Sequence, residues 1–387
     1  METKAGDPGA FAHFNLHRVP SPAFVVDEMA LRRNLAILSD VKQRSGAKIL
    51  CAMKAFSMWK VAPIIGEYLD GVCSSGLWES RLARDYYTGE IATYCAGYKE
   101  ADMAEIVEIS DHVIFNSPHQ HRRFASFLND SVDIGLRINP EHAEGEVAKY
   151  DPCSPGSRLG FPISQLKAEH LKGVSGLHFH TLCEQDFEPL KRTWEALKPH
   201  IAPYFEQLRW VNFGGGHHIT RADYQRDELV AFIQEVRAET GLDVYLEPGE
   251  AIGIGTGVLV GTVLDLVHNG VDIAIIDISA TNHMPDTLEM PYRADIMDAD
   301  LPGKLPHTYR LGSVTCLAGD VIGDYSFAEP LKIGQRLVFM DMSHYTFVKN
   351  TTFNGVPLPA IASFDPASGQ TQVVRRFGYA DYKNRLS

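Results

Sequence analysis

The sequence lacks three features that would place it in whole classes of protein. It has no apolar run near the roughly 18 residues of a membrane-spanning helix. It has no excess of positive charge, because its formal net charge is −13 at pH 7, which argues against a surface for nucleic acid or anionic membranes. It contains no Cys-x-x-Cys pair. We therefore expect reduced cysteines and neither a disulfide framework nor a zinc site. Because the first residues are polar and acidic, with no apolar signal region, we also expect a cytoplasmic protein.

The sequence does contain ample material for a folded core. Of its 387 residues, 45% are hydrophobic and 22% are charged, which is usual for globular proteins. The length suggests two domains, or one large barrel with an appendage. The negative charge is compatible with a small cationic substrate.

From residue 48 to about residue 250, short apolar runs alternate with longer stretches that carry apolar residues at helical spacing. The apolar runs cover residues 48–53, 71–74, 91–95, 112–116, 133–139, 174–180, 208–213 and 243–247. The clearest helical stretches cover residues 77–87, 118–128, 187–205 and 223–240. Eight such repeats over roughly 200 residues are typical of a parallel barrel. A doubly wound sheet is the alternative, but its phosphate-binding glycines usually follow the first strand, whereas here they follow the seventh.

After about residue 256 the pattern becomes rich in β-strand signals, with turns of Gly, Pro and Asp between them. The strand-like runs cover residues 258–267, 271–278, 337–340 and 345–348, and residues 20–27 near the N-terminus are also strand-like. We therefore predict an α/β protein with a (β/α)8 TIM-like barrel over residues 27–255. Residues 1–26 and 256–387 are predicted to form an antiparallel β domain.

Active sites of such barrels form at the C-terminal ends of the strands. The residues at those ends are Lys54, Asn116, Arg137, His180, Gly214, Gly215, Gly216 and Glu247. Lys54 ends a buried strand, so desolvation lowers its pKa and prepares its amine to condense with an aldehyde cofactor. An ordinary exposed lysine is the alternative when the residue is taken by itself.

The other residues at this end allow more than one interpretation. The run Gly214–Gly216 could bind an anion through backbone N–H groups, helped by a helix that we expect to follow it, or could simply make a tight turn. His180 could stack on a flat cofactor ring, could bind metal with His178 and Glu184, or could be structural. Glu247 could hold a proton on a pyridine nitrogen or form a salt bridge at the barrel rim.

Two residues of the predicted β domain also carry chemistry. Cys316 lies in a glycine-bounded loop and could donate a proton, although a buried inert thiol is the alternative. Tyr345 could donate a hydrogen bond to a phosphate, or could be a strand aromatic.

Seven segments, taken in order, carry a family resemblance. They are AMKAFS at residues 52–57, SRLG at 157–160, LHFHTLCE at 177–184, EPGEA at 247–251, DISATNHMPD at 277–286, LEMPYR at 288–293 and TCLAGDVIGD at 315–324. The set resembles the barrel-type, alanine-racemase-like pyridoxal-phosphate decarboxylases, a group that includes ornithine, arginine and diaminopimelate decarboxylases. The resemblance covers about residues 20–379. It is strongest to the members that act on carboxynorspermidine or carboxyspermidine.

The resemblance implies pyridoxal 5'-phosphate as the cofactor, with no metal, and a role for each matching residue. In this resemblance Lys54 holds the cofactor covalently, Arg137 lies beside it and His180 stacks on its ring. Glu247 contacts the ring nitrogen. The phosphate is bound by Gly214, Gly215, Gly216 and Tyr345. Cys316 matches the cysteine that returns a proton to the substrate carbon after carbon dioxide leaves. In this family that cysteine reaches into the neighbouring subunit's site, which implies a homodimer with shared active sites.

Two departures from the family pattern bear on the substrate. Relatives that act on ornithine or diaminopimelate usually carry arginine after Glu-Pro-Gly, where this chain has Glu250, and Cys183 replaces a serine of the phosphate site. Glu250, Asp286 and Asp320 are candidate ligands for substrate amines, because carboxylates bind the ammonium groups of a polyamine. The resemblance thus implies decarboxylation to norspermidine or spermidine, with catalytic roles for Lys54, Cys316 and His180.

Other functions stay open at this point. The chain could decarboxylate diaminopimelate, ornithine or arginine, although Glu250 would repel the distal carboxylate of diaminopimelate. A racemase is disfavoured, because racemases of this group place arginine at the ring nitrogen. A catalytically silent homologue that regulates a true decarboxylase is a further alternative, although it would have no need of Lys54, Glu247 and Cys316 together.

Overall fold

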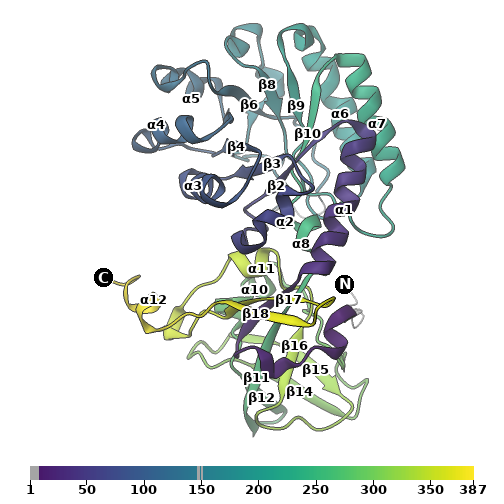
Figure 1. Cartoon of the computed structure of the whole chain (residues 1–387), viewed down its shortest axis with the longest axis vertical. Coiled ribbons are helices and arrows are strands. Elements are labelled where there is room, and N and C mark those ends of the chain that lie inside the picture. Colours follow the sequence, from purple (N-terminus) through teal and green to yellow (C-terminus); the bar gives the residue numbers. More distant parts are fainter. Residues whose placement is uncertain (1–7, 146–148, 150) are drawn as a thin grey trace. The chain divides into compact units, whose positions relative to one another are not determined.

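The computed structural model describes residues 8–145, 149 and 151–387, which form two compact units (Figure 1). The barrel unit is Arg33–Ile252, and the β unit combines the described residues up to Arg32 with Gly253–Ser387. We predicted these boundaries at residues 27 and 255. The observed boundary between Arg32 and Arg33 falls inside helix α1 (Glu28–Ser45), so the first turn of this helix is counted with the β unit. Residues 1–7, which we assigned to the β domain, lie outside the described residues.

The barrel unit is built from parallel strands. Within the described residues, eight strands close into a ring, and each of them overlaps one of the predicted apolar runs. In order around the ring they are β2 (Lys48–Ala52), β3 (Gly71–Ser74), β4 (Glu90–Tyr94), β5 (His112–Phe115), β6 (Asp133–Asn139), β8 (Gly176–His178), β9 (Trp210–Asn212) and β10 (Asp243–Leu246). The short strand β7 (Phe161–Pro162) pairs with β6 outside the ring. The predicted (β/α)8 barrel is confirmed.

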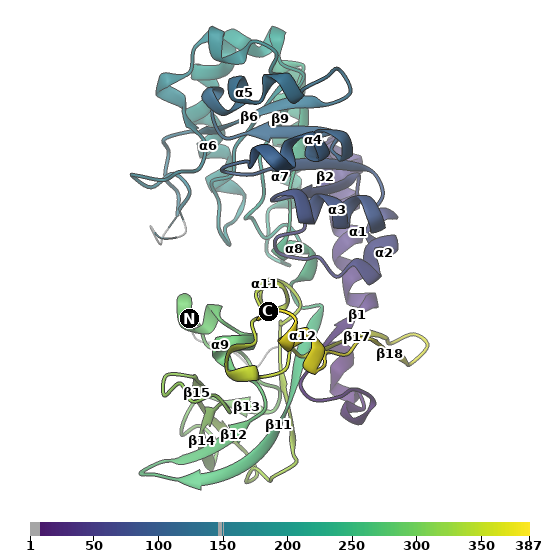
Figure 2. The same ribbon diagram turned by 90° about the vertical axis from the view of Figure 1, so that its left-hand side faces the viewer.

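Helices surround the strands, as Figures 1 and 2 show for α3, α4, α5, α6 and α7. Their bounds are α2 (Ala62–Gly66), α3 (Leu77–Tyr86), α4 (Glu100–Ile109), α5 (Pro118–Arg123), α6 (Phe187–Ile201), α7 (Arg226–Thr240) and α8 (Glu250–Gly253). In α6, the residues Phe187, Leu190, Trp194, Leu197 and Ile201 recur every three or four positions and are buried. This spacing places one apolar stripe against the strands, which is why the stretch is helical.

The N-terminal ends of the barrel strands hold a charged network beside a cavity of ≈ 380 Å³. Lys48 pairs with Glu90, and His112 Nε2 lies 3.0 Å from Glu90 Oε2. The Tyr245 hydroxyl donates to the same oxygen at 3.0 Å. Burial opposes ionisation of Glu90, but the hydrogen bonds from His112 and Lys48 outweigh it and lower its pKa to about 2. Because this end of a barrel contributes to stability and the opposite end carries the chemistry, we assign the network a structural role.

The β unit contains a mixed sheet. Its strands are β1 (Ala23–Asp27), β11 (Gly257–His268), β12 (Asp272–Ile276), β13 (Ala299–Asp300), β14 (His307–Gly312), β15 (Val321–Phe327), β16 (Arg336–Phe339), β17 (Ala360–Asp365) and β18 (Gln370–Arg375). Most pairings are antiparallel, as predicted, but β1 pairs with β17 and β12 pairs with β14 in parallel. The N-terminal strand β1 lies between β11 and β17.

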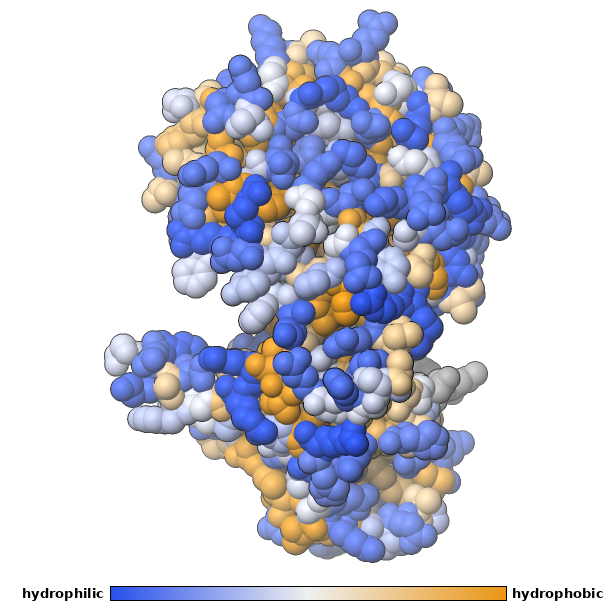
Figure 3. Space-filling model, viewed as in Figure 1, coloured by the Kyte–Doolittle hydropathy of each residue, from blue (hydrophilic) through white to orange (hydrophobic). Residues whose placement is uncertain are grey.

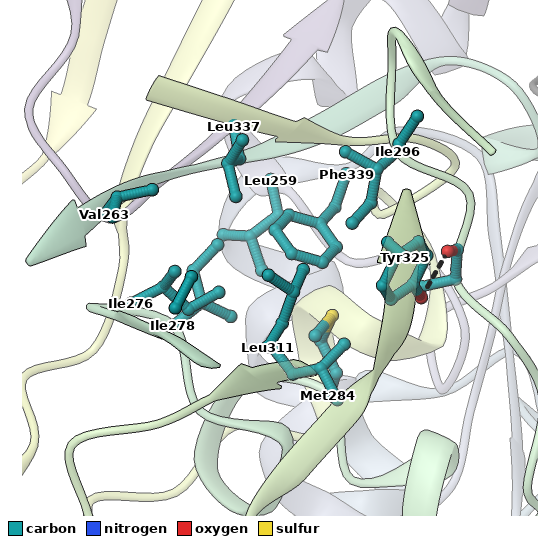
Figure 4. Close-up of a cluster of buried hydrophobic side chains, with 14 of the residues drawn as sticks. Leu259, Val263, Ile276, Ile278, Met284, Ile296, Leu311, Tyr325, Leu337 and Phe339 are labelled. Atoms are coloured by element: carbon teal, nitrogen blue, oxygen red, sulfur yellow. Dashed lines mark hydrogen bonds between the residues drawn. The ribbon is translucent and has the colours of Figure 1, made fainter. Parts of the chain in front are cut away.

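A cluster of apolar side chains fills the interior of the β unit (Figure 4). Leu259, Leu311 and Phe339 come from three different strands and are completely buried. Tyr325 is also buried, and its hydroxyl donates a hydrogen bond to the Ala294 carbonyl at 2.7 Å, which satisfies the one polar group of this side chain.

The segment predicted as a strand at residues 345–348 is instead the short helix α11 (Tyr345–Val348). Its aromatic and β-branched residues favour a strand by propensity. Tertiary packing overrides that preference, because the helical turn buries Thr346 and places the ring of Phe347 5.4 Å from that of Phe24. Three other short helices of the β unit are α9 (Ala280–His283), α10 (Asp286–Glu289) and α12 (Tyr379–Lys383). In the described part of the chain, no helix is both long and apolar enough to cross a membrane.

Candidate active site

Lys54 lies just beyond the C-terminal end of β2, separated from it by Met53. Its Nζ lies 3.3 Å from Nε2 of His180. The residue is exposed, yet the surrounding protein displaces water from its amine, and this desolvation together with the charge of Arg137 lowers the pKa of Lys54. A lowered pKa increases the neutral, nucleophilic fraction of the amine.

The hydrogen bonds of His180 are consistent with a neutral lysine. The backbone N–H of Gly215 donates to Nδ1 of His180 at 3.1 Å, so Nδ1 carries no hydrogen. Desolvation holds the pKa of His180 well below its ordinary value. The neutral ring therefore carries its hydrogen on Nε2, which faces Lys54. An N–H group in this position pairs with the lone pair of a neutral amine and not with an ammonium group.

Glu247 follows β10 and receives a hydrogen bond on each carboxylate oxygen. Asn212 Nδ2 donates to Oε1 at 2.7 Å, and His178 Nε2 lies 3.1 Å from Oε2. Burial opposes ionisation of this carboxyl, but the hydrogen bonds of His178 and Asn212 outweigh it, so the pKa of Glu247 is lowered. Glu247 is therefore an anion in the interior of the barrel mouth, where its side chain is 11% exposed.

Arg137 lies in β6 and is buried. Its Nη2 donates to the carbonyl oxygen of His180 at 3.2 Å, and its guanidinium lies 4.6 Å from the centre of the Tyr94 ring. Strand register pairs Arg137 with His178, and His178 with Asn212. Side chains paired in register point to the same face of a sheet, which explains how one end of the barrel gathers them.

The glycine run makes a tight turn that only glycine allows at two positions. Gly214 has φ +68° and Gly216 has φ +87°, and a Cβ on Gly216 would lie 1.9 Å from the Leu182 carbonyl oxygen. The helix that we predicted after this run, at residues 223–240, is α7, which begins at Arg226 and not directly after Gly216. Backbone N–H groups of the glycine turn can bind an anion by themselves.

Glu250 is the first residue of α8. One of its carboxylate oxygens lies 3.3 Å from Nε2 of His218, and its side chain is 19% exposed. Sequence reasoning considered His178 only as a metal ligand and missed Asn212, Tyr94 and Cys73, and the structure places all four near Glu247, Arg137 or Lys54. Cys73 and Cys183 both lie near enough to Lys54 to act on its pKa. Cys73 lies in β3 and Cys183 follows β8, and this position in or after a barrel strand could have predicted that they lie near the site.

The structure does not support the metal interpretation of the histidine pair. His178 faces Glu247, and His180 uses its ring nitrogens toward Gly215 and Lys54. No three His, Cys, Asp or Glu side chains among the residues that the structure describes are grouped so that they could hold a metal ion.

Four predicted site residues belong to the β unit. Cys316 is exposed in the loop between β14 and β15, and its backbone N–H donates to Asn354 Oδ1 at 2.8 Å. Tyr345 opens α11, and Asp286 opens α10. Lys349 contacts both of them, because its Nζ donates to Asp286 Oδ1 at 2.7 Å and lies 5.3 Å from the centre of the Tyr345 ring.

Asp320, the fourth, is buried and accepts three hydrogen bonds. The hydroxyls of Ser279 and Thr315 donate to Oδ2 at 2.6 and 2.5 Å, and the backbone N–H of Thr281 donates to Oδ1 at 3.1 Å. These contacts join the loop before β15 to the start of α9. They favour a structural role over the direct substrate contact that we predicted.

Replacing Asp320 with alanine should therefore destabilise the protein. The change leaves three donors without their acceptor, which should lower the free energy of unfolding by about 1–3 kcal/mol, measured by denaturant unfolding. Asp324→Ala is a matched control, because the side chains of the Asp324–Arg310 pair are 38% and 44% exposed and such a pair contributes little to stability. A higher KM for a polyamine substrate with unchanged stability would instead make Asp320 a substrate ligand.

The set of side chains at the barrel mouth fits pyridoxal phosphate. A lysine with a lowered pKa can hold an aldehyde, an anionic glutamate can partner a protonated ring nitrogen, and the glycine turn can receive a phosphate. Fold and site together define a barrel enzyme of the class that carries this cofactor on a lysine.

Comparisons with known proteins give the family. The family model described as "Pyridoxal-dependent decarboxylase, C-terminal sheet domain" matches residues 23–343. The chain therefore belongs to the pyridoxal-dependent decarboxylases, and its cofactor is pyridoxal 5'-phosphate, as predicted.

Individual relatives cover nearly the full length. The carboxynorspermidine/carboxyspermidine decarboxylase of Campylobacter jejuni is 41% identical over 95% of this chain and 99% of its own. The carboxyaminopropylagmatine decarboxylase of Synechocystis is also 41% identical, over 96% of each chain. The crystal structure of the Campylobacter jejuni carboxynorspermidine decarboxylase complexed with norspermidine superimposes with a TM-score of 0.89 at 40% identity, covering 95% of this chain and 100% of the other.

Proposed function

We propose that this chain decarboxylates carboxynorspermidine and carboxyspermidine to norspermidine and spermidine in polyamine biosynthesis. The observation that carries the proposal is the match over nearly the full length to the Campylobacter jejuni relative, which is named for this activity. The net charge of −13 and Glu250 at the barrel mouth also suit a polycationic substrate.

A second candidate substrate is carboxyaminopropylagmatine. The relative named for it has the same 41% identity as the Campylobacter jejuni enzyme, so sequence identity does not separate the two candidates. Agmatine ends in a guanidinium group where a simple polyamine ends in an ammonium group. Carboxylate side chains bind both, so both candidates belong to one substrate class, the carboxylated polyamines.

We assign the chemistry to the following groups. Pyridoxal phosphate, when bound, supplies an electron-poor ring that accepts the electron pair released as carbon dioxide leaves. Lys54 would hold the cofactor through its Nζ. Glu247, as an anion, would keep a proton on the ring nitrogen, and the flat ring of His180 would support the cofactor. The Cys316 thiol then donates its proton to the substrate carbon, and solvent returns a proton to the thiolate.

Arg137, Tyr345 and the glycines Gly214, Gly215 and Gly216 complete the proposed cofactor site. The buried guanidinium of Arg137 donates to the carbonyl of His180 and so holds the residue that we place against the ring. The family resemblance is what supports Tyr345 as a phosphate ligand.

We also infer a homodimer in which Cys316 serves the partner's barrel. The exposure of Cys316 agrees with this, because a buried thiol could not reach another subunit. Apolar side chains are exposed around the turn between β11 and β12, at Leu264, Val267 and Val271, and Figure 3 shows apolar surface on the β unit. We place the protein in the cytoplasm, because all six cysteines are free of disulfides and would stay reduced there.

Glu250→Gln should weaken catalysis on carboxylated polyamines. A hydrogen bond to a charged group contributes about 1.5–3 kcal/mol, so kcat/KM should fall roughly ten- to a hundredfold, mainly through KM. Asp286→Asn should have a smaller effect of the same kind, because Lys349 already offsets the charge of Asp286. The measurement is carbon dioxide release from carboxynorspermidine, carboxyspermidine, carboxyaminopropylagmatine, diaminopimelate, ornithine and arginine.

Glu239→Gln is the matched control for this experiment. Glu239 lies in α7, is 45% exposed and pairs with Lys198, so its loss should leave kcat/KM unchanged. A higher kcat/KM of the unmodified protein for diaminopimelate or ornithine than for any carboxylated polyamine would contradict the substrate class and leave only the decarboxylase chemistry.

A further inference from the structure

His178 is a buried histidine for which the proposed reaction has no direct use. It is the last residue of β8, and its side chain is 2% exposed. We infer that His178 is a positioning residue which, together with Asn212, fixes the Glu247 carboxylate in the orientation that receives the ring nitrogen of the cofactor. The inference rests on the proposed function and assigns a residue that the family resemblance leaves without a role.

The geometry of the pair is set by the barrel itself. His178 and Asn212 are direct neighbours in the register of β8 and β9, and Glu247 follows β10, the next strand of the ring. The two donors reach different oxygens of the carboxylate, at 3.1 Å for His178 and 2.7 Å for Asn212. Two donors on two oxygens fix both the position and the plane of the group, which one donor would leave free to rotate.

The hydrogen of the His178 ring is on Nε2, the nitrogen that faces Glu247. The other nitrogen, Nδ1, is buried and has no hydrogen-bond partner among the described residues. A hydrogen on Nδ1 would thus be a buried unsatisfied donor, which is costly, whereas an unpaired lone pair is tolerated better. Desolvation lowers the pKa of His178 despite the opposing effect of Glu247, so the ring is a neutral donor.

The arrangement leaves room for the cofactor. A carboxylate has about four acceptor positions, and the two hydrogen bonds from His178 and Asn212 use two of them. Each oxygen of Glu247 can therefore still accept a hydrogen bond from a ring nitrogen. The neutral histidine brings no positive charge of its own to compete with a protonated ring for Glu247.

A purely structural role for His178 is the alternative. Its ring stacks on Tyr94, with centroids 5.6 Å apart and an interplanar angle of 26°, so it also contributes to packing. The two roles differ in what a substitution changes. Loss of packing lowers stability alone, whereas loss of positioning changes the bound cofactor.

The test compares His178→Leu and His178→Gln with the unmodified protein. His178→Leu should change the absorbance spectrum of the bound cofactor, weaken cofactor binding in titrations of the apoprotein, and lower kcat about ten- to a hundredfold with little change in KM. Glutamine can place an N–H near the position of Nε2, so His178→Gln should restore most of the spectrum, cofactor affinity and kcat.

His112→Leu is the matched control. His112 is also buried and also contacts a glutamate, at 3.0 Å from Glu90, but at the opposite end of the barrel. The His112→Leu substitution should lower thermal stability and leave the cofactor spectrum unchanged.

A His178→Leu protein with reduced stability but a normal spectrum and cofactor affinity would overturn the inference, and so would a His178→Gln protein as impaired as His178→Leu. Failure of the proposed function would appear separately, as an unmodified protein that binds cofactor but does not act on carboxylated polyamines.

Discussion

Reduction of the protein with borohydride should fix pyridoxal phosphate covalently on Lys54. The Lys54→Ala substitution should lower the rate of decarboxylation by about 10²–10⁴-fold or more, which is on the order of the loss of a general acid or base. The reason is that the Lys54 amine lies at the barrel mouth and has a lowered pKa. Peptide mass mapping after reduction locates the adduct. The Lys54→Ala protein should fold normally, because an exposed side chain contributes little to stability.

Lys60→Ala controls for the loss of a nearby lysine. Lys60 is exposed in the short helical turn Trp59–Val61, six positions along the chain from Lys54, and should keep full activity, yellow colour and adduct formation. Recovery of the adduct on a different lysine, or on none, would refute the assignment of Lys54.

The second large effect concerns Cys316. Cys316→Ala should lower kcat by about 10²–10⁴-fold, because it removes the proposed proton donor, while substrate binding stays nearly unchanged. If the site is shared between subunits, then mixing and refolding Cys316→Ala with Lys54→Ala should regenerate activity. Random pairing gives hybrids in half of the dimers, each with one native site of two, so about a quarter of normal activity is expected.

The control for the hybrid experiment is a mixture of Lys54→Ala with Glu247→Gln. Both of these residues lie in the barrel unit, so no hybrid site would contain both native residues, and mixing should recover nothing. Recovery in this control, or no recovery with Cys316→Ala, would exclude the shared site.

The barrel was predictable from the sequence because each of its buried strands is a continuous apolar run. The same reasoning placed Lys54, Arg137, His180 and Glu247 at one end, because strand ends follow directly from strand limits. The contacts among the side chains at this end could not be predicted from the sequence. His178 and Glu247 lie 69 positions apart, and their contact depends on the register of the barrel strands, which no local pattern encodes.

Predictions from local pattern were weakest in the β unit. Residues 345–348 have strand propensity, but packing of Phe347 on Phe24 makes them a helix. Strands β14 and β18 are largely polar and mostly half-buried or exposed, so they lack the apolar runs that marked the others. The three donors that contact Asp320 could not be predicted either, because they come together only when the loops before α9 and β15 meet.

The position of β1 in the sheet has a consequence for biosynthesis. This strand is translated before the barrel unit, yet its two neighbours are β11 and β17, which begin at Gly257 and Ala360. The residues of the barrel unit are all translated before either neighbour exists. During elongation β1 therefore lacks both partners while the barrel unit is translated, and the β unit can close only after β17 has been translated. A nascent chain that stalls before residue 360 would expose an apolar strand with one free edge, which is the kind of surface that chaperones bind and that aggregates when left uncovered.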